Sequence, residues 1–289
     1  LPASVALPFG VFERTLSDPA NSESAKKHEG LLAKMGRVSG EENPGILSGL
    51  RETILGLEAP VGLAGALRTV MEQEGLEWPA GWDEAWLCIK KVWASKWNDR
   101  AYLSREANGI PHDALVMSVL IQRVIESEYS FVIHTINPFT GARDEIYAEA
   151  VLGLGETLAA NYPGRALGFA WSKRAGEARL LSFPSKSIGI YGGGLIFRSD
   201  SNGEDLSGYA GAGLYDSFVM PEPRRLSLDY SGEPLFWDET FRRNLLLSIG
   251  NLGRAVEDVL QYPQDIEGAY SKGRFFVVQT RPQVGLENG

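Results

Sequence analysis

Four polar residues near the C-terminal end have types and a spacing that suit phosphate chemistry. Asp265 and Glu267 lie two residues apart, as do Gln279 and Arg281, and Gly273 lies midway between the two pairs. We expect the chain to fold back at Gly273 as an unbulged antiparallel hairpin, in which Glu267 faces Gln279. The neighbouring opposed pair is then Asp265 and Arg281, and the two-residue repeat of a strand places all four side chains on one face. Two acids, a carboxamide and a guanidinium on one face can bind a divalent cation beside an anionic oxygen, as nucleotide phosphates with Mg²⁺ require.

A second group of residues, 198–217, has the composition of a phosphate-binding loop. A short strand predicted at 195–197 delivers Arg198 into small and turn-forming residues, and glycines that alternate with alanines follow. Glycines let the backbone come close to an anion. The spacing matches neither the P-loop pattern nor the glycine pattern of dinucleotide-binding folds. The alternative is a flexible loop in which Arg198 pairs with Glu204 or Asp205.

The first 110 residues are predicted to form mainly helices. Candidate helices cover residues 22–35 and 45–57, and a third begins near Asp83 and ends before Asn108. The aromatic and apolar residues of the third helix follow a 3.6-residue period and are Trp82, Trp86, Ile89, Trp93 and Trp97. This spacing favours burial in a core over the functional alternative for four tryptophans so close together, a sugar-binding strip.

From residue 111 the pattern changes to strands. Apolar, β-branched stretches at 115–125 and 131–136 and an alternating stretch at 144–151 predict a sheet. The last two stretches are separated by a turn signal at 137–141, which indicates a hairpin.

The remaining residues contain a predicted connector and one more predicted helix. Residues 184–194 are predicted to be a glycine-rich connector and 238–260 an amphipathic helix. The fold class is therefore expected to be α+β, in one domain at 1–289 with three parts. These are a mainly helical part at 1–110, a sheet-rich part at 111–190, and the phosphate loop, helix and catalytic hairpin at 191–289.

Composition excludes several classes of function. With 289 residues, of which 44% are hydrophobic, the chain can bury the core of one big domain or two smaller ones. Lys and Arg number 28 against 37 Asp and Glu, and the formal charge of −9 argues against a nucleic-acid partner, which requires a basic surface. No segment approaches the roughly 20 apolar residues of a membrane-spanning helix, so we expect no membrane partner. Cys88 is the only cysteine, which excludes an intrachain disulfide and fits a reducing compartment.

The motifs in this chain resemble the ATP-binding domain of the phosphohistidine dikinases. That group includes pyruvate phosphate dikinase, phosphoenolpyruvate synthase, rifampicin phosphotransferase and the starch-phosphorylating dikinases, and the α-glucan, water dikinases are the most similar. The resemblance covers nearly the whole chain and rests on seven segments, which are Val92-Trp-Ala-Ser-Lys-Trp-Asn-Asp-Arg100, Phe131-Val-Ile-His-Thr-Ile-Asn-Pro138, Gly153-Leu-Gly-Glu156, Arg198-Ser-Asp-Ser-Asn-Gly-Glu-Asp-Leu206, Gly211-Ala-Gly-Leu-Tyr-Asp216, Gln264-Asp-Ile-Glu267 and Gln279-Thr-Arg-Pro282.

The resemblance implies an ATP-grasp-like fold with ATP and Mg²⁺ between two lobes. On the nucleotide side it implies that Arg198 contacts phosphate, that Gly213 and Ser217 lie in the loop over the phosphates, and that Gln122 lies near the adenine. Relatives also carry a Gly-Gly-Lys segment just upstream of the position of Leu1, and its lysine contacts the phosphates of ATP. That lysine is absent here, so we expect weak affinity.

On the hairpin, the resemblance assigns catalytic roles to the same four polar residues. Glu267 and Gln279 would hold metal and phosphate, Asp265 would support them, and Arg281 would stabilise the transferring phosphoryl group. These roles agree with the direct interpretation of the residues, because phosphoryl transfer requires positioning and charge neutralisation.

In the family, ATP phosphorylates a histidine on a separate domain with release of AMP and phosphate, and the β-phosphate then reaches a glucosyl hydroxyl of starch. None of the three histidines here is expected to be that acceptor: His28 is placed in a predicted exposed helix, His112 at a turn, and His134 inside a strand. The chain, which begins at Leu1, is expected to be a fragment of a longer plastid kinase and to be inactive on glucan alone. A homodimer is one option for its assembly.

Two other functions remain open at this stage. One is a related dikinase with another acceptor, such as pyruvate, a phosphoglucan or a drug. Chain order favours the glucan branch over it, because in the phosphoenolpyruvate synthases the arginine segment precedes the Trp/Phe-Ala-Ser helix, whereas Arg198 follows that helix here by about 100 residues. The other is a non-catalytic nucleotide-binding module.

Overall fold

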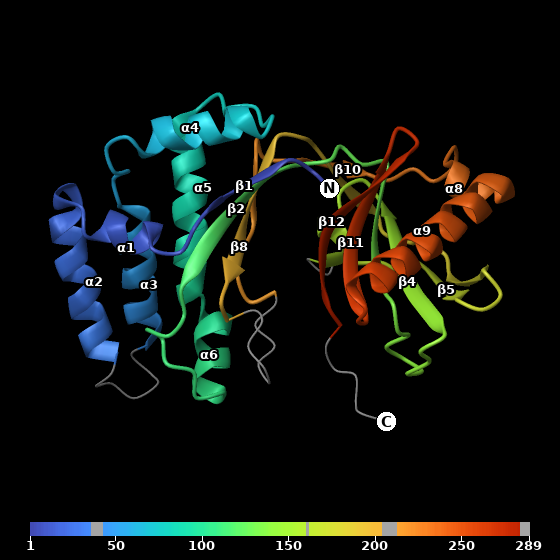
Figure 1. The fold of residues 1–289 in the computed structure, drawn as a ribbon, viewed down its shortest axis with the longest axis horizontal. Coiled ribbons are helices and arrows are strands. Elements are labelled where there is room, and N and C mark those ends of the chain that lie inside the picture. The colour runs from blue at the N-terminus through green and yellow to red at the C-terminus, as the bar shows by residue number, and fades with distance from the viewer. Residues whose placement is uncertain (36–42, 160–161, 204–212, 284–289) are drawn as a thin grey trace. The chain divides into compact units, whose positions relative to one another are not determined.

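The computed structural model describes residues 1–35, 43–159, 162–203 and 213–283, which form two compact units. The helical unit consists of Ala3–Val124 and Gly194–Pro221. The sheet unit consists of Leu1–Pro2, Ile125–Gly193 and Glu222–Gly289. Each unit is therefore built from segments that are far apart in the sequence. Helices and strands occur in both, as expected for an α+β chain (Figure 1).

The helical unit contains six of the α-helices and a four-stranded antiparallel sheet in the order β1-β2-β8-β9. The helices are α1 (Val11–Leu16), α2 (Ser22–Met35), α3 (Asn43–Leu55), α4 (Leu63–Gln73), α5 (Trp82–Ala94) and α6 (Asp99–Ala107), with 3-10 turns at Pro19–Asn21 and Ser95–Trp97. The strands are β1 (Ser4–Leu7), β2 (Met117–Arg123), β8 (Leu195–Ser201) and β9 (Phe218–Met220). Helix α5 packs on one face of this sheet, against β2, β8 and β9 (Figure 1).

The two faces of the four-stranded sheet differ in character because strand residues alternate between them. Val119 and Ile121 of β2 and Phe197 of β8 are buried in the core that α5 completes. The intervening residues, which include Gln122 and Arg198, belong to the opposite face. The helices thus cover one face, and the other carries Gln122 and Arg198 beside their apolar partners Ile196 and Leu120.

The tryptophan pattern is confirmed as core packing. Trp86, Trp93 and Trp97 are buried in the helical unit, and Trp93 is only 2% exposed. The Trp86 indole also donates a hydrogen bond to the carbonyl of Leu57 at 2.9 Å. The predicted helix is interrupted after Ala94 by a 3-10 turn, and α6 continues only after an extended residue at 98.

One expectation for this unit is wrong. His28 is buried, although its helix was expected to be exposed, because its ring packs edge-on against Phe12 and Trp97 at centroid distances of 6.1 and 6.4 Å. Burial lowers the pKa of the His28 imidazole. Its helix, α2, has the bounds that the sequence predicted, 22–35.

The sheet unit is built on a six-stranded antiparallel sheet in the order β12-β11-β3-β4-β5-β6. Its strands are β3 (Tyr129–His134), β4 (Glu145–Leu152), β5 (Leu167–Ser172), β6 (Glu177–Ser182), β11 (Gln264–Ser271) and β12 (Arg274–Pro282). A second, two-stranded sheet pairs β7 (Ile188–Tyr191) with β10 (Arg224–Ser227), and the helices are α7 (Glu156–Ala159), α8 (Pro234–Trp237) and α9 (Glu239–Leu260). The predicted hairpin around 137–141 is confirmed as β3 and β4, but 184–194 is not only a connector because it contains β7.

Helix α9 packs along one face of the six-stranded sheet (Figure 1). It begins where Asp238 accepts a hydrogen bond from the Phe241 amide at 2.9 Å, which caps the helix. Its approach to the sheet is close: a Cβ atom at Gly250 would lie 2.4 Å from the Trp171 ring. The core therefore lies between α9 and the sheet, and the other face of the sheet carries the polar residues described below. Among the described residues, no helix combines the length and the apolar character that a membrane crossing requires.

We predict that Trp93→Ala lowers the free energy of unfolding by roughly 3 to 5 kcal/mol, because it leaves a cavity in the core of the helical unit. Urea denaturation followed by circular dichroism measures the change. Leu87→Ala is the matched control, since Leu87 lies on the same helix and is partly exposed, and it should cost less than about 1 kcal/mol. Unchanged stability of the Trp93 variant together with lost α-glucan binding would instead support a sugar-binding strip.

Lys96 gives the helical unit a pH-dependent stability. Burial, and then the charge of Arg105, lower the pKa of the Lys96 ammonium from 10.5 to about 8 in the folded protein. Between these values the unfolded chain holds the proton and the folded chain does not, so stability contributed by this residue rises with pH, by at most about 3 kcal/mol. Its ammonium also donates to the Leu115 carbonyl at 2.6 Å.

We therefore predict that Lys96→Met removes this rise in stability between pH 8 and 10. Urea denaturation at pH 7, 8, 9 and 10 measures it as the difference between variant and wild type. Lys26→Met, on the exposed side of α2, is the control and should leave the pH dependence unchanged. Equal pH profiles for the wild type and the Lys96 variant would contradict the prediction.

Candidate functional site

The hairpin predicted at the C-terminal end is present as β11 and β12. Asp265 pairs with Arg281 and Glu267 pairs with Gln279, as predicted from their spacing. The residue between the two acids, Ile266, is fully buried against α9. Strand alternation therefore places the four polar residues on the face of the sheet opposite α9.

The hairpin is bulged, which the sequence argument did not expect. The turn is a two-residue loop of Lys272 and Gly273, with φ of 49° and 77°, as in type I′ turns. Such a loop alone would place Glu267 opposite Val278. The pairing shifts by one residue directly after Glu267, and its partner becomes Gln279. The two-residue turn shifts the pairing by one position and the bulge shifts it back, so Glu267 still faces Gln279.

The same polar face continues into the neighbouring strands. Asp265 pairs with His134 of β3, and His134 pairs with Tyr147 of β4. The rings of His134 and Tyr147 stack at a centroid distance of 6.2 Å. Together with Arg281, these residues form a row across four strands, which we call the polar row: Arg281, Asp265, His134 and Tyr147.

Asp265 is held at the centre of this row. One of its carboxylate oxygens lies 2.7 Å from Nδ1 of His134, and the other lies 3.6 Å from Nε of Arg281. The Asp265 side chain is only 13% exposed, whereas that of Arg281 is 40% exposed. Asp265 is therefore placed to orient its neighbours, while Arg281 keeps a surface that a ligand can reach.

Tyr147 extends the row as a neutral donor. Its hydroxyl donates a hydrogen bond to Glu149 at 2.9 Å. Burial, and then this bond, raise the pKa of the Tyr147 phenol well above its usual value, so it stays protonated at neutral pH. The contributions of His134, Tyr147 and Glu149 were not predicted from the sequence. The two-residue alternation of the strands around 131–136 and 144–151 was the available signal.

The pair next to the polar row has the donor set that Mg²⁺ can use. Glu267 is exposed and Gln279 is half-buried opposite it. Mg²⁺ is usually bound through one or two carboxylates, with waters and substrate phosphates completing its shell. In the described part of the chain, no three His, Cys, Asp or Glu side chains gather as a metal cluster. The residues therefore fit an ion that arrives with a phosphate ligand.

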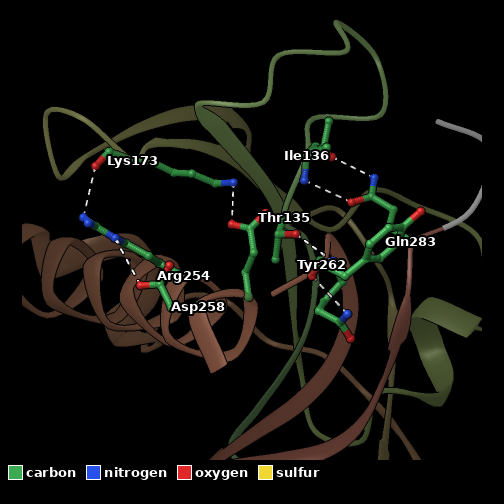
Figure 2. Close-up of polar contacts among 9 residues, drawn as sticks. Thr135, Ile136, Lys173, Arg254, Asp258, Tyr262 and Gln283 are labelled. Carbon is green, nitrogen blue, oxygen red and sulfur yellow. Dashed lines mark hydrogen bonds and ion pairs between the residues drawn. The ribbon is translucent and has the colours of Figure 1, made fainter. Parts of the chain in front are cut away.

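The open end of the hairpin is tied to the end of β3 (Figure 2). The Gln283 amide oxygen accepts from the Ile136 backbone N–H at 3.0 Å, and its amide nitrogen donates to the Ile136 carbonyl at 2.8 Å. One residue earlier in β3's extension, the Thr135 hydroxyl accepts from the Gln264 N–H at 2.8 Å. These three contacts are all buried hydrogen bonds between a side chain and the backbone, and they hold both strands of the hairpin at the end where Asp265 and Arg281 lie.

In the helical unit, two of the expected residues share one sheet face. Gln122 of β2 is buried, and Arg198 lies on the adjacent strand β8, opposite Leu120. The strand was expected to end before Arg198, but β8 continues to Ser201, so Arg198 lies within it. Its alternative partners Glu204 and Asp205 lie outside the described residues.

The expected phosphate loop, 198–217, is described at its two ends, 198–203 and 213–217. Most of its alternating glycines, at 208–212, lie outside the described residues. Gly213 and Ser217 are described, and both are exposed. Gly213 has a φ of 76°, and a Cβ atom there would meet nothing within 4 Å. Four expected site residues thus belong to the helical unit, and the other four belong to the sheet unit.

Comparison with known proteins gives two kinds of match. Residues 48–162 match the family described as pyruvate phosphate dikinase, AMP/ATP-binding domain. The chain is 49% identical to an α-glucan water dikinase of Solanum tuberosum and 48% identical to one of Arabidopsis thaliana, both named as chloroplastic, over 98% of its length. A phosphoenolpyruvate synthase of Pyrococcus furiosus is 26% identical over 69% of the chain.

These relatives are much longer than the chain. It spans about a fifth of their length, 20% for both α-glucan water dikinases and 22% for the phosphoenolpyruvate synthase. The match to an ATP-binding domain agrees with the resemblance that the motifs indicated.

We predict that Gly268→Ala lowers the free energy of unfolding by roughly 1 to 3 kcal/mol. Gly268 follows the bulge, and a Cβ atom there would lie 2.1 Å from the Phe131 ring, so either the ring or the bulged strand must move. Urea denaturation measures the loss. Gly232→Ala is the control in the same unit, because nothing lies within 4 Å of its Cβ position. Equal stability of the two variants would contradict the packing argument.

Proposed function

We propose that this chain, whose residues 48–162 belong to the pyruvate phosphate dikinase AMP/ATP-binding domain family, is the ATP-binding domain of an α-glucan, water dikinase. In this proposal residues 1–289 act as one domain that donates phosphoryl groups. The observation that carries the proposal is the hairpin register, which puts an acid opposite an amide and a second acid opposite an arginine. That arrangement supplies metal binding and anion binding side by side.

The helical unit contributes nucleotide-binding residues. Arg198 contacts the phosphates, and Gly213 and Ser217 approach them with backbone N–H groups and a hydroxyl. Gln122, a buried carboxamide on the same sheet face as Arg198, lies at the adenine side. An amide can both donate to and accept from the edge of a base.

The sheet unit contributes phosphoryl-transfer residues. Glu267 and Gln279 bind Mg²⁺, which neutralises charge on the polyphosphate when it is bound. Asp265, held by His134, orients Arg281. The Arg281 guanidinium stabilises the phosphoryl group as its negative charge spreads during transfer.

The acceptor is a histidine on another domain of the full-length enzyme. None of the three histidines in this chain is assigned as the phosphoryl acceptor. His28 is buried, His112 contacts Arg105 and Glu106, and His134 is bonded to Asp265. There ATP and water react with the histidine: the histidine nitrogen takes the β-phosphate as AMP leaves, and water takes the γ-phosphate, which is released as inorganic phosphate. The β-phosphate then passes from the phosphohistidine to a glucosyl hydroxyl of α-glucan. By analogy with the relatives named as chloroplastic, the enzyme acts in the plastid.

A second candidate is a related dikinase with another acceptor. It is favoured by the match to the Pyrococcus furiosus phosphoenolpyruvate synthase and by a match to a rifampicin phosphotransferase of Bacillus subtilis, at 27% identity over 67% of the chain. Both matches are weaker and cover less of the chain than those to the α-glucan water dikinases. An assay of the full-length protein with each acceptor distinguishes the two candidate functions.

We predict that Glu267→Ala and Arg281→Ala each abolish formation of AMP from ATP in the full-length protein while the fold is kept. Glu267 loses the metal-binding carboxylate, and Arg281 loses the charge that stabilises transfer. Chromatographic detection of AMP measures turnover, and circular dichroism checks the fold. Glu177→Ala is the control, because Glu177 is an exposed acid on β6 of the same sheet, and it should retain turnover.

Three outcomes would contradict the proposal. Normal AMP formation by both hairpin variants would remove the site assignment. Absence of Mg²⁺-dependent ATP binding in a calorimetric titration of the full-length protein would remove the enzyme and favour a non-catalytic module. Phosphorylation of pyruvate or a drug, without phosphorylation of α-glucan, would select the second candidate.

A further inference from the structure

The segment directly after Gly213 is attached to the start of α6 by three polar contacts. Arg100 forms an ion pair with Asp216 and also donates from Nε to the Leu214 carbonyl at 3.0 Å. The Asn98 amide donates to the other carboxylate oxygen of Asp216 at 2.7 Å. These contacts join residues more than 110 positions apart in the sequence, and all of them lie within the helical unit.

Asn98 is used in an unusual way for its position. It stands at the N-cap of α6, where an asparagine side chain normally accepts hydrogen bonds from the first turn of the helix. Here its side chain makes no such bond. Its amide donates to Asp216 instead, so the Asn98 side chain holds the segment after Gly213 and does not cap α6.

Apolar contacts hold the same segment from the other side. Tyr215 is buried in the core of the helical unit, and Leu214 and Phe218 pack against that core. The Lys91 ammonium lies 5.4 Å from the centre of the Phe218 ring. The backbone of 214–218 is thus fixed both by side chains in the core and by the contacts of Asp216.

The attachment leaves two neighbouring residues exposed. Gly213 and Ser217 flank the anchored residues, and both are exposed. They are the two residues to which our proposed function gives phosphate contacts. A binding segment that is already held in one conformation loses less entropy when its ligand binds.

We propose that Arg100 and Asn98 are positioning residues for the phosphate contacts of ATP, acting through Asp216 and Leu214. This inference rests on the proposed function. Arg100 is suited to the role because its planar guanidinium can donate to two acceptors at fixed angles, which a lysine ammonium does less well. A purely structural role is the alternative. It is disfavoured because the Arg100 and Asp216 side chains are 54% and 37% exposed, and exposed ion pairs contribute little to stability.

The test compares ATP with adenosine, which has the base but no phosphates. Calorimetry with Mg²⁺ measures both affinities for wild type, Arg100→Ala, Asp216→Ala and the double variant. We expect each single variant to bind ATP about tenfold more weakly and adenosine within about twofold of wild type. The double variant should bind ATP less weakly than the product of the two single effects, because both single variants remove the Arg100–Asp216 ion pair and their effects are then not additive. Arg100→Lys should recover part of the ATP affinity.

A second ion pair in the same unit provides the matched control. Arg68 and Glu72, one turn apart on α4, form an exposed pair at 3.0 Å. Alanine at either position should leave both affinities unchanged. Hydrogen exchange of the backbone amides at 214–217 gives a second measurement on the free protein, and it should be at least about tenfold faster in Arg100→Ala.

The outcomes separate this inference from the proposed function. If wild type binds ATP and the Arg100 and Asp216 variants bind it equally well, the positioning role is wrong and the proposed function stands. Equal weakening of ATP and adenosine binding shows a structural role and overturns the inference as well. If wild type binds neither ligand, the proposed function fails and the positioning role falls with it.

Discussion

The chemistry assigned to the sheet unit depends on one extra residue in β12. Strand side chains alternate between faces, so a slip of one position would turn Gln279 and Arg281 toward α9 and bury a charged group in an apolar core. The turn of Lys272 and Gly273 sets one register, and the bulge beside Glu267 changes it to the register in which the polar residues face away from the helix. Gly268 makes the bulge compatible with the Phe131 ring beneath it. Packing on one side of the sheet thereby determines the pairing on the other.

In both units, the two faces of the sheet have different roles. In each, helices bury the apolar residues of one face, and the expected site residues of the strands lie on the other. The polar residues are then supported by the backbone rather than by long flexible segments: Arg198 lies within a strand, and Asp265 is fixed between two neighbouring strands. Rigid support of this kind suits phosphoryl transfer, in which a protein mainly positions groups and neutralises charge. The matched family is consistent with that use.

The sequence predicted local structure well and partner choice less well. Helix α2 follows from short-range periodicity, which is why its bounds were predicted correctly. The opposed pairs of the hairpin were also predicted correctly, but because the bulge offsets the two-residue turn and not because the hairpin is unbulged. The strand β7 was not predicted, because its glycine-rich segment becomes a strand only by pairing with β10, more than 30 residues later. His28 was misplaced for a similar reason: its burial depends on Phe12 and Trp97, which belong to other elements.

The site residues show the same difference between short-range features, which were predicted, and long-range contacts, which were not. The acids and the arginine of the hairpin could be named from spacing alone, whereas the contact between His134 and Asp265 joins residues 131 positions apart. The attachment of Asp216 to Asn98 and Arg100 is equally remote. Long-range contacts of this kind leave no periodic signal, so they can be read only from the folded chain.

The order of the segments also has a consequence for synthesis of the protein. The sheet of the helical unit needs β8, which follows β2 by about 70 residues. At a translation rate of about 5 to 20 residues per second, the edge of β2 waits several seconds for its partner. During that time the intervening residues, which begin the sheet unit, emerge from the ribosome. The helical unit is completed by β9, and the sheet unit only by β12, which ends about 60 residues later. Until β8 emerges, β2 is paired with β1 alone, and its other edge is an open strand edge of the kind that another chain can pair with.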